Sequence, residues 1–219
     1  MRALILDFGG VISRTMFETH PMTEAALGLA PGTLSWRGPF DPASDPLWRD
    51  MLADKLTERD YWWYRTQEVA KLIGADWTEM SDFVRAARGA EPAATIRPEA
   101  LEAIAQVKAA GRKRAVLSNE LDLYYGEAFR ERLAVLDDFD AIVDATHTGI
   151  LKPDPLAYEL CCAALEVAPR DCVFLDDQPR NLRGAEAAGM TAVPFDVRAP
   201  RASFDAALRV LGLHEDARA

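Results

Sequence analysis

The sequence has few cysteines, no long apolar run and fewer basic than acidic residues. Its three cysteines include the adjacent pair Cys161 and Cys162, so the chain lacks a disulfide framework and a reducing compartment is expected. No apolar run approaches the length of a membrane span, and the short run near the start lacks the basic flank of a signal peptide. These features predict a soluble, cytoplasmic protein whose cysteines pack in its core.

The balance of charge limits the kind of partner. The 219 residues carry a net charge of −10. Nucleic acids and anionic membrane surfaces are polyanions, so neither is expected as a main partner. A small anionic substrate remains compatible with this charge if the field inside the site is positive. With 49% hydrophobic residues, the chain can bury one sizeable core, and nothing in it requires an oligomer in order to fold.

Short apolar runs alternate with helical patterns over most of the chain. Each run is continuous rather than alternating, as expected for strands that are buried on both faces. This order predicts a doubly wound α/β fold with a parallel sheet, in which ligands bind at the carboxyl ends of the strands. The predicted strands are 3–6, 115–117, 141–143, 173–175 and 192–195, and the predicted helices are 98–110, 121–133, 155–165 and 181–188.

The interval between the first two strands departs from this alternation. It has no convincing strand, and its position predicts a helical cap that closes over the strand ends, excludes water and selects the substrate. The predicted domains are therefore an α/β core of residues 1–13 and 96–219 and a helical cap of residues 14–95, with a loose tail at 214–219. The predicted cap helices are one at 46–55, one that begins at Thr57 and ends near Gly74, and one that begins at Asp76 or Thr78.

Polar residues follow the predicted strands at the points where the strands end. The first strand ends on Asp7, and a carboxylate before the pair Gly9 and Gly10 is typical of a nucleophile or a metal ligand. Taken alone, the pattern slightly favours a turn whose amides the carboxylate satisfies. Because the ends of parallel strands meet at one edge of a sheet, further polar residues are expected beside Asp7. These are Ser118, Asn119, Lys152, Asp176, Asp177 and Asn181.

Several of these residues also have a purely structural interpretation. Ser118 can cap the helix that begins near Leu121, and Asn181 can cap its own helix. Lys152, which precedes a proline, can be a solvated loop residue. His147 is expected to be an exposed loop residue without a catalytic role.

Four segments together resemble the haloacid dehalogenase superfamily of hydrolases, in the subfamily whose helical cap is inserted after the first strand. They lie in the order and spacing of that family and span the whole predicted core. The four segments are LILDFGGVI at 4–12, VLSNE at 116–120, FDAIVDATHTGILKPDP at 139–155 and VFLDDQPRNLRGAEAAGM at 173–190.

The resemblance implies a chemical role for the residues around Asp7. Asp7 itself would attack phosphorus in line and form an aspartyl-phosphate, which water would then hydrolyse. Ser118 would donate a hydrogen bond to a phosphoryl oxygen, and Lys152 would neutralise charge on Asp7 and on the phosphoryl group. Backbone N–H groups around Phe8, Gly9 and Asn119 would help to bind the substrate.

The resemblance also implies a magnesium site. Oxygen ligands suit Mg²⁺, and water and a substrate oxygen would complete its octahedron. Asn181 would orient the acids or Lys152 from outside the set of ligands. The implied ligands are the carboxylates of Asp7, Asp176 and Asp177 and the backbone carbonyl of Gly9.

Gly9 is where the sequence departs from the family pattern. Phosphatases of the family have an aspartate at this position, which protonates the leaving alkoxide and later deprotonates water. Loss of a general acid costs a factor of about 10² to 10⁴ when the leaving group is poor. Three chemistries remain open: transfer from an activated donor such as an acyl phosphate or a sugar 1-phosphate, proton supply by a cap residue or water, and displacement of a group such as halide that needs no proton.

Two other branches of the family and a non-catalytic protein are the alternatives. The dehalogenases share the nucleophile but use no magnesium, whereas the adjacent acids Asp176 and Asp177 require a cation. The phosphonate-cleaving branch needs a cap lysine, and neither Lys55 nor Lys71 has a recognisable context. A protein that only binds a phosphorylated metabolite or a protein partner would gain stability by losing these buried charges. The sequence therefore favours a Mg²⁺-dependent phosphatase that acts on a small phosphorylated metabolite.

The predicted cap is rich in aromatic residues, above all at 61–64. Consecutive helical residues point in different directions, so most of these rings are expected in the cap core, with one or two lining the pocket, and a homodimer through the cap is left open. The cap has nine basic and thirteen acidic residues, so any anion site in it must be local. The candidates for such a site are Lys55, Arg59 and Arg65.

Overall fold

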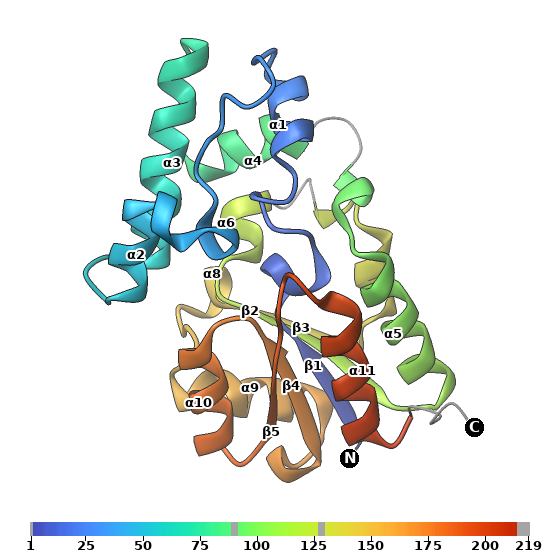
Figure 1. The fold of residues 1–219 in the computed structure, drawn as a ribbon. Helices are drawn as coiled ribbons and strands as arrows, with labels where there is room; N and C mark the ends of the chain where they lie inside the picture. The colour runs from blue at the N-terminus through green and yellow to red at the C-terminus, as the bar shows by residue number, and fades with distance from the viewer. Residues whose placement is uncertain (1, 89–91, 127–129, 214–219) are drawn as a thin grey trace.

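The five predicted strands form one parallel sheet in the computed structural model, which describes residues 2–88, 92–126 and 130–213 (Figure 1). The order across the sheet is β3-β2-β1-β4-β5, and every neighbouring pair is parallel. The doubly wound α/β fold predicted from the sequence is therefore confirmed. The strands are β1 (Ala3–Leu6), β2 (Lys113–Ser118), β3 (Ala141–Asp144), β4 (Cys172–Asp176) and β5 (Thr191–Pro194).

Helices cover both faces of the sheet because alternate side chains of each strand point to opposite sides. Leu4 and Leu6 of β1 pack with α5 (Pro98–Ala109) and α11 (Pro200–Leu211). Ile5 packs on the other face, in a cluster with buried residues of α9 (Pro155–Leu165) and α10 (Pro179–Ala187). All three cysteines are buried and free, as predicted, and they belong to this second cluster.

The register of the central strands positions the site. Leu6, the last residue of β1, pairs with Val116 of β2 and with Leu175 of β4. The backbone N–H of Asp7 then donates to the carbonyl of Leu175, at 3.0 Å. Asp7 therefore leaves the sheet between the ends of β2 and β4.

Four α-helices lie above the carboxyl ends of the strands (Figure 1). They pack around a cluster of their own, which includes Phe17, Trp36, Trp48, Tyr61 and Phe83. The chain passes between this layer and the sheet at an isolated bridge between Ser13 and Ile96. The four helices are α1 (His20–Ala26), α2 (Pro46–Leu52), α3 (Glu58–Ile73) and α4 (Met80–Arg88).

Several boundaries differ from the predictions, and each difference has a local cause. Of the helix predicted at 121–133, α6 spans Leu121–Tyr125 and ends before Gly126, which has φ +73°; residues 127–129 lie outside the described part of the chain. The helix predicted at 46–55 ends at Leu52, close to Asp54, which has φ +55°. The chain also contains α1 and α11, which were not predicted. The predicted tail at 214–219 lies outside the described residues. The remaining short helices are α8 (Ala145–Thr148), one turn at Phe8–Ile12, and 3₁₀ turns at Gly38–Phe40, Pro42–Ser44, Pro92–Thr95, Ala134–Asp138 and Pro169–Asp171.

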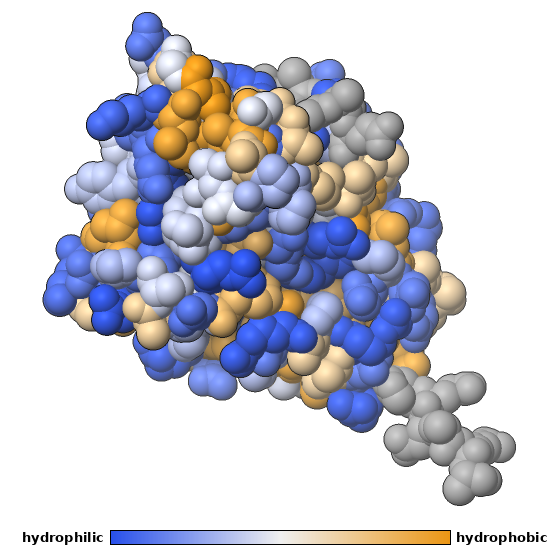
Figure 2. Space-filling model, turned by 45° about the horizontal axis from the view of Figure 1, so that its top comes forward, coloured by the Kyte–Doolittle hydropathy of each residue, from blue (hydrophilic) through white to orange (hydrophobic). Residues whose placement is uncertain are grey.

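The surface has both hydrophilic and hydrophobic areas. In Figure 2, which turns the helical layer toward the viewer, hydrophilic residues cover most of the visible face and the largest hydrophobic area lies near its top. Trp63 and Tyr64 of α3 are exposed, whereas Tyr61 is buried. The aromatic side chains at 61–64 therefore point in different directions, as expected for consecutive residues of a helix. None of the described helices is long and apolar enough to cross a membrane.

Candidate active site

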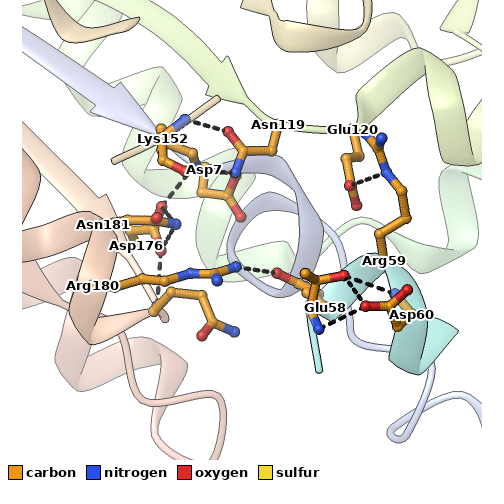
Figure 3. Close-up of polar contacts among 12 residues, drawn as sticks. Asp7, Glu58, Arg59, Asp60, Asn119, Glu120, Lys152, Asp176, Arg180 and Asn181 are labelled. Carbon is orange, nitrogen blue, oxygen red and sulfur yellow. Dashed lines mark hydrogen bonds and ion pairs between the residues drawn. The ribbon is translucent and has the colours of Figure 1, made fainter. Parts of the chain in front are cut away.

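Lys152 lies between two acids at the carboxyl ends of adjacent strands (Figure 3). Its Nζ is 2.7 Å from Oδ1 of Asp7 and 2.7 Å from Oδ2 of Asp176. The Lys152 side chain is only 2% exposed, so this is a buried ion pair rather than the solvated loop lysine that its sequence context allowed. A buried cation of this kind is tolerated because both acids compensate it.

The pKa values of these groups depend on burial and on each other. Burial alone would lower the pKa of Lys152, but Asp176 and Asp7 outweigh it and raise that pKa, so the ammonium stays charged. For Asp7, burial raises the pKa to about 6, and the attraction of Lys152 opposes this shift. Burial also raises the pKa of Asp177 well above its usual value, and repulsion by Asp176 and Asp7 adds to the shift.

Two asparagines hold this arrangement in place. The Asn119 side chain donates through Nδ2 to the carbonyl of Lys152, at 3.1 Å, and accepts the N–H of Lys152 at Oδ1, at 2.7 Å. Asn181 donates through Nδ2 to both carboxylate oxygens of Asp176, at 3.1 Å each. From the sequence, Asn119 was expected to act through its backbone N–H. In the structure its side chain also contributes, because it anchors the loop of Lys152.

Asp7 is followed by a tight turn at Phe8–Ile12. Gly10 has φ +84°, which favours glycine there, and a Cβ at this position would lie in tight contact with Oδ2 of Asp177, at 3.1 Å. Gly9 is exposed, and a Cβ at its position would meet no atom within 4 Å. The guanidinium of Arg97, which the sequence analysis did not single out, donates to the carbonyl of Gly10 through Nε and Nη2 at 3.1 and 3.0 Å.

The remaining predicted residues lie in the same cavity. It is lined by Asp7, Phe8, Gly9, Ser118, Asn119, Lys152, Asp177 and Asn181. Asp176 contacts this set through Lys152 and Asn181. Ser118 is buried at the end of β2, and its Oγ accepts the backbone N–H of Glu120 at 3.3 Å. The structure therefore brings every sequence-predicted site residue to one end of the sheet.

The start of α3 adds Glu58 to this cavity and places Arg59 against Glu120, which lines it (Figure 3). Glu58 lies 3.5 Å from Arg180 of α10, and Arg59 donates to Glu120 at 3.0 Å. Burial raises the pKa of Glu58 to about 7, and repulsion by Glu120 and Asp7 adds to the shift. Glu58 was missed by sequence reasoning, because its position after the capping residue Thr57 shows that it begins a helix and not which way it points.

The anion site suggested by Lys55, Arg59 and Arg65 is not formed. Lys55 pairs with Asp50 at the surface. Arg65 is buried in the helical layer, where it pairs with Asp45. Arg59 pairs with Glu120, an acid in the wall of the cavity.

A second, largely apolar chamber adjoins the cavity and has a volume of about 730 Å³. Gly9, Glu58 and Asp177 line both spaces, so the two are continuous. The walls of the chamber include Phe17, Trp48, Trp62, Phe83 and Tyr125. This agrees with the expectation that one or two rings of the aromatic cap would line the pocket.

His147 differs from its predicted place in a loop. It lies in α8, about half exposed, and Nε2 contacts the buried carboxylate of Asp122. With Asp144, these two form a set of possible metal ligands that lie within 4.8 Å of one another. Asp144 accepts the backbone N–H groups of Asp122 and Thr146, and Oδ2 of Asp122 also accepts from Arg130, whereas Oδ1 of Asp122 is buried without a hydrogen-bond partner. The contacts of Asp144 therefore cap local structure.

Comparison with known proteins places this geometry in a family. The sequence model of haloacid dehalogenase-like hydrolases matches residues 1–189. The chain is 38% identical to β-phosphoglucomutase of Bacillus subtilis over 78 residues, which cover 36% of this chain and 34% of that protein. It is 25% identical to (S)-2-haloacid dehalogenase of Xanthobacter autotrophicus over 222 residues, which cover 96% and 79%.

A solved structure shares the fold. The phosphatase of this family from Thermococcus onnurineus superposes with a TM-score of 0.60 at 18% identity, over 99% of this chain and 100% of that one. The alignments with several curated relatives span less than half of those proteins. The family model nevertheless matches most of the chain, and the chain therefore belongs to the haloacid dehalogenase-like hydrolases.

Proposed function

We propose that the protein is a Mg²⁺-dependent phosphatase that hydrolyses a small phosphorylated metabolite through an aspartyl-phosphate at Asp7. The observation that carries this proposal is the position of Lys152, which contacts both Asp7 and Asp176 in a cavity that Asp177 also lines. One buried ammonium faces three carboxylates, so a divalent cation would balance the remaining charge. The relatives include phosphate-processing enzymes and a dehalogenase.

The donors around Asp7 suit Mg²⁺. They are all oxygen atoms, as this cation prefers. When bound, Mg²⁺ would reduce the charge repulsion between the nucleophile and the phosphoryl group. The residues that would hold it are Asp7, Asp176, Asp177 and the backbone carbonyl of Gly9.

In the first step, a carboxylate oxygen of Asp7 attacks phosphorus and the bond from phosphorus to the leaving oxygen breaks. Lys152 fixes the orientation of Asp7 through Oδ1 and offsets charge on the phosphoryl group. Ser118, at the end of β2, donates a hydrogen bond to a phosphoryl oxygen. Phe8, Gly9 and Asn119 contribute backbone N–H groups to the same oxygens.

We assign the proton that the leaving oxygen needs to Glu58. Glu58 lines the cavity together with Gly9, where other phosphatases of the family have an aspartate. A pKa of about 7 keeps a large fraction of Glu58 protonated at neutral pH, so it can act as a general acid. In the second step, its carboxylate takes a proton from water as the water oxygen attacks phosphorus. The bond from phosphorus to Asp7 then breaks and inorganic phosphate leaves.

The helical layer completes the proposal. We propose that residues 14–95 form a cap and that residues 1–13 and 96–219 form the catalytic core. The cap would select the substrate and exclude water from the cavity. We further propose that the protein acts in the cytoplasm on a small anionic molecule rather than on nucleic acid or membranes, and that exposed cap residues such as Trp63 and Tyr64 offer a surface for a homodimer.

The experiment that tests this proposal is a hydrolysis assay with and without Mg²⁺. The panel contains alkyl phosphates, sugar 1-phosphates, acyl phosphates and 2-haloacids, and phosphate and halide release are both measured. Asp7→Asn removes the nucleophile, and Asp137→Asn is the matched control because Asp137 is exposed and remote from the site. We expect Mg²⁺-dependent phosphate release that is lost in Asp7→Asn and retained in Asp137→Asn.

Other outcomes have definite meanings. Metal-independent halide release would replace the proposal with the dehalogenase reaction, in which the same Asp7 attacks carbon. Absence of turnover on the whole panel, together with a rise in Tm on addition of a phosphorylated compound, would indicate a protein that binds its ligand without catalysis.

A further inference from the structure

Arg88 is a buried arginine in the wall of the apolar chamber. It ends α4, and only 4% of it is exposed. Its Nη2 donates to the backbone carbonyl of Arg14 at 3.0 Å and to the hydroxyl of Tyr125 at 3.4 Å. The guanidinium carbon also lies 5.8 Å from the centre of the Tyr125 ring. These contacts hold the guanidinium in place, and both of its hydrogen bonds are made by Nη2, one of its three nitrogen atoms.

The other two nitrogen atoms of Arg88 are not satisfied. Nε and Nη1 are buried, and neither has a hydrogen-bond partner. No acid among residues 2–88, 92–126 and 130–213 forms an ion pair with Arg88. A buried guanidinium without a carboxylate is costly, and among the described residues Arg88 has none, so its charge and donors are suited to an anionic partner.

The chemistry of that partner follows from the donors. Nε and Nη1 lie on either side of the Cδ atom and their N–H groups point apart, so a carboxylate accepts a hydrogen bond from one of them and compensates the positive charge of the guanidinium. The neighbouring walls are aromatic, with Phe83 on the same helix and Trp62 on α3. An apolar body that bears a carboxylate would thus match both the walls and the free donors.

The chamber is continuous with the proposed catalytic cavity, but Arg88 lines only the chamber. The acids Glu58 and Asp177 line both spaces, so an anionic group is repelled where the two spaces meet and attracted at Arg88. Gly9, which has no side chain, leaves the passage between them open.

We propose that the chamber binds the part of the substrate that remains after phosphate is removed, and that this part is an apolar body with a carboxylate bound by Arg88. The proposal rests on the proposed phosphatase function, because it assigns the leaving group of that reaction. It places the substrate among phosphate esters of hydrophobic hydroxy acids rather than of sugars.

A binding experiment tests this without requiring turnover. The ligands are 3-phenylpropionate and its neutral counterpart 3-phenylpropanamide, titrated by calorimetry and by the fluorescence of Trp48 and Trp62 in the chamber wall. The variants are Arg88→Met, Arg88→Lys and the control Arg85→Met, which removes an exposed arginine of the same helix that pairs with Asp82. The Tm of every variant is measured to verify folding.

We expect the acid to bind at least about tenfold more tightly than the amide to the natural protein and to Arg85→Met. Arg88→Met should lose this preference and still bind the amide, and Arg88→Lys should keep part of it. Equal binding of acid and amide, a preference that survives in Arg88→Met, or no binding of either compound would overturn the proposal. If Arg88→Met does not fold, the natural protein and Arg88→Lys still decide it.

The result is separate from the test of the phosphatase function. A protein that hydrolyses simple phosphate esters but does not distinguish acid from amide would keep the proposed function and lose the assignment of the chamber. A protein that shows the Arg88-dependent preference without any phosphate release would keep the chamber and lose the phosphatase.

Discussion

At the scale of single residues, two adjacent glycines have different reasons to be present. Gly10 has φ +84°, and a Cβ there would lie in tight contact with Oδ2 of Asp177, at 3.1 Å. Gly9 has φ −72° and ψ 118°, values that any residue adopts, and open space around it. Glycine at position 9 is therefore not required by the fold. The absence of a side chain at position 9 therefore affects the chemistry of the site and not the fold.

Gly9→Asp should restore the general acid that the family places at this position. We expect the variant to fold with a Tm close to that of the natural protein and to hydrolyse alkyl phosphates at least about tenfold faster, since a general acid contributes 10² to 10⁴ in favourable cases. The matched control is Gly10→Asp, which should lose both stability and activity. An unchanged rate on alkyl phosphates in a folded Gly9→Asp would show that proton transfer does not limit the reaction.

Glu58→Gln should slow the hydrolysis of alkyl phosphates by about 10² or more and affect acyl phosphates little, because only the poor leaving group needs a proton. The loss should appear in kcat rather than in KM, since the amide keeps the size of the side chain. Glu68→Gln, on the same helix but paired with Arg65, is the control. Equal losses on both classes of substrate would contradict the assignment of Glu58 as the acid.

At the scale of elements, α3 is the helix of the upper layer that carries Glu58 into the cavity. Its first turn is held by a capping box in which Thr57 accepts the N–H of Asp60 and Asp60 accepts the N–H of Thr57, at 3.1 and 2.9 Å. Glu58 and Arg59 lie inside this turn. The capping box therefore sets the direction in which the side chains of Glu58 and Arg59 leave the helix.

Thr57→Ala should destabilise the protein by about 1 kcal/mol, because the N-cap side chain of α3 is lost. Urea denaturation with an unchanged m-value would measure this change. Thr33→Ala, at a partly exposed threonine outside the helices whose hydroxyl donates to the carbonyl of Ala30, should have a smaller effect. A Thr57→Ala protein as stable as the natural one would mean that the first turn of α3 is held by its contacts with the core instead.

The elements that the sequence predicted best have local signals. The start of α3 at Thr57 and its end at Gly74, with φ +69°, follow from residues that cap helices wherever they occur. The buried strands follow from continuous apolar runs. The helix α11 was not predicted, although half of its residues point into the core, because Pro200 and Gly212 bound it without an N-cap side chain.

The residues of the candidate site likewise fall into those that the sequence predicts and those that it does not. The strand ends follow one another in the order of the sheet, so Asp7, Lys152 and Asp176 could be expected together before the geometry was known. Arg88 and Arg97 could not, since each acts on a backbone carbonyl more than 70 residues away in the sequence. Such pairs form only when the helical layer packs on the sheet, and no local pattern records them.

At the scale of the whole molecule, acids from both layers face one cavity. Glu58 comes from the helical layer, whereas Asp7 and Asp177 come from the sheet. Ion pairs across the boundary, Arg59 with Glu120 and Glu58 with Arg180, hold the two layers together at this point. The stability of the molecule should therefore respond to the protonation of this cavity.

The folded state raises the pKa of Glu58 from 4.5 to about 7, mainly through burial, so it holds this proton more tightly than the unfolded chain. The stability that Glu58 contributes is complete below pH 4.5 and is lost as the pH rises through about 7. In metal-free buffer, Tm should fall across this range, and less so in Glu58→Gln. A Glu58→Gln profile that parallels the natural one would contradict the raised pKa.

Arg97 connects the two layers in a further way. Its guanidinium binds the carbonyl of Gly10 in the turn after the nucleophile, and the same group binds Glu18 at the start of the helical layer through Nη1, at 2.8 Å. The turn after Asp7 and the start of the helical layer therefore share one guanidinium. If a ligand in the chamber changes the affinity at Asp7 through this contact, thermodynamic linkage requires that a group bound at Asp7 changes the affinity of the chamber by the same factor.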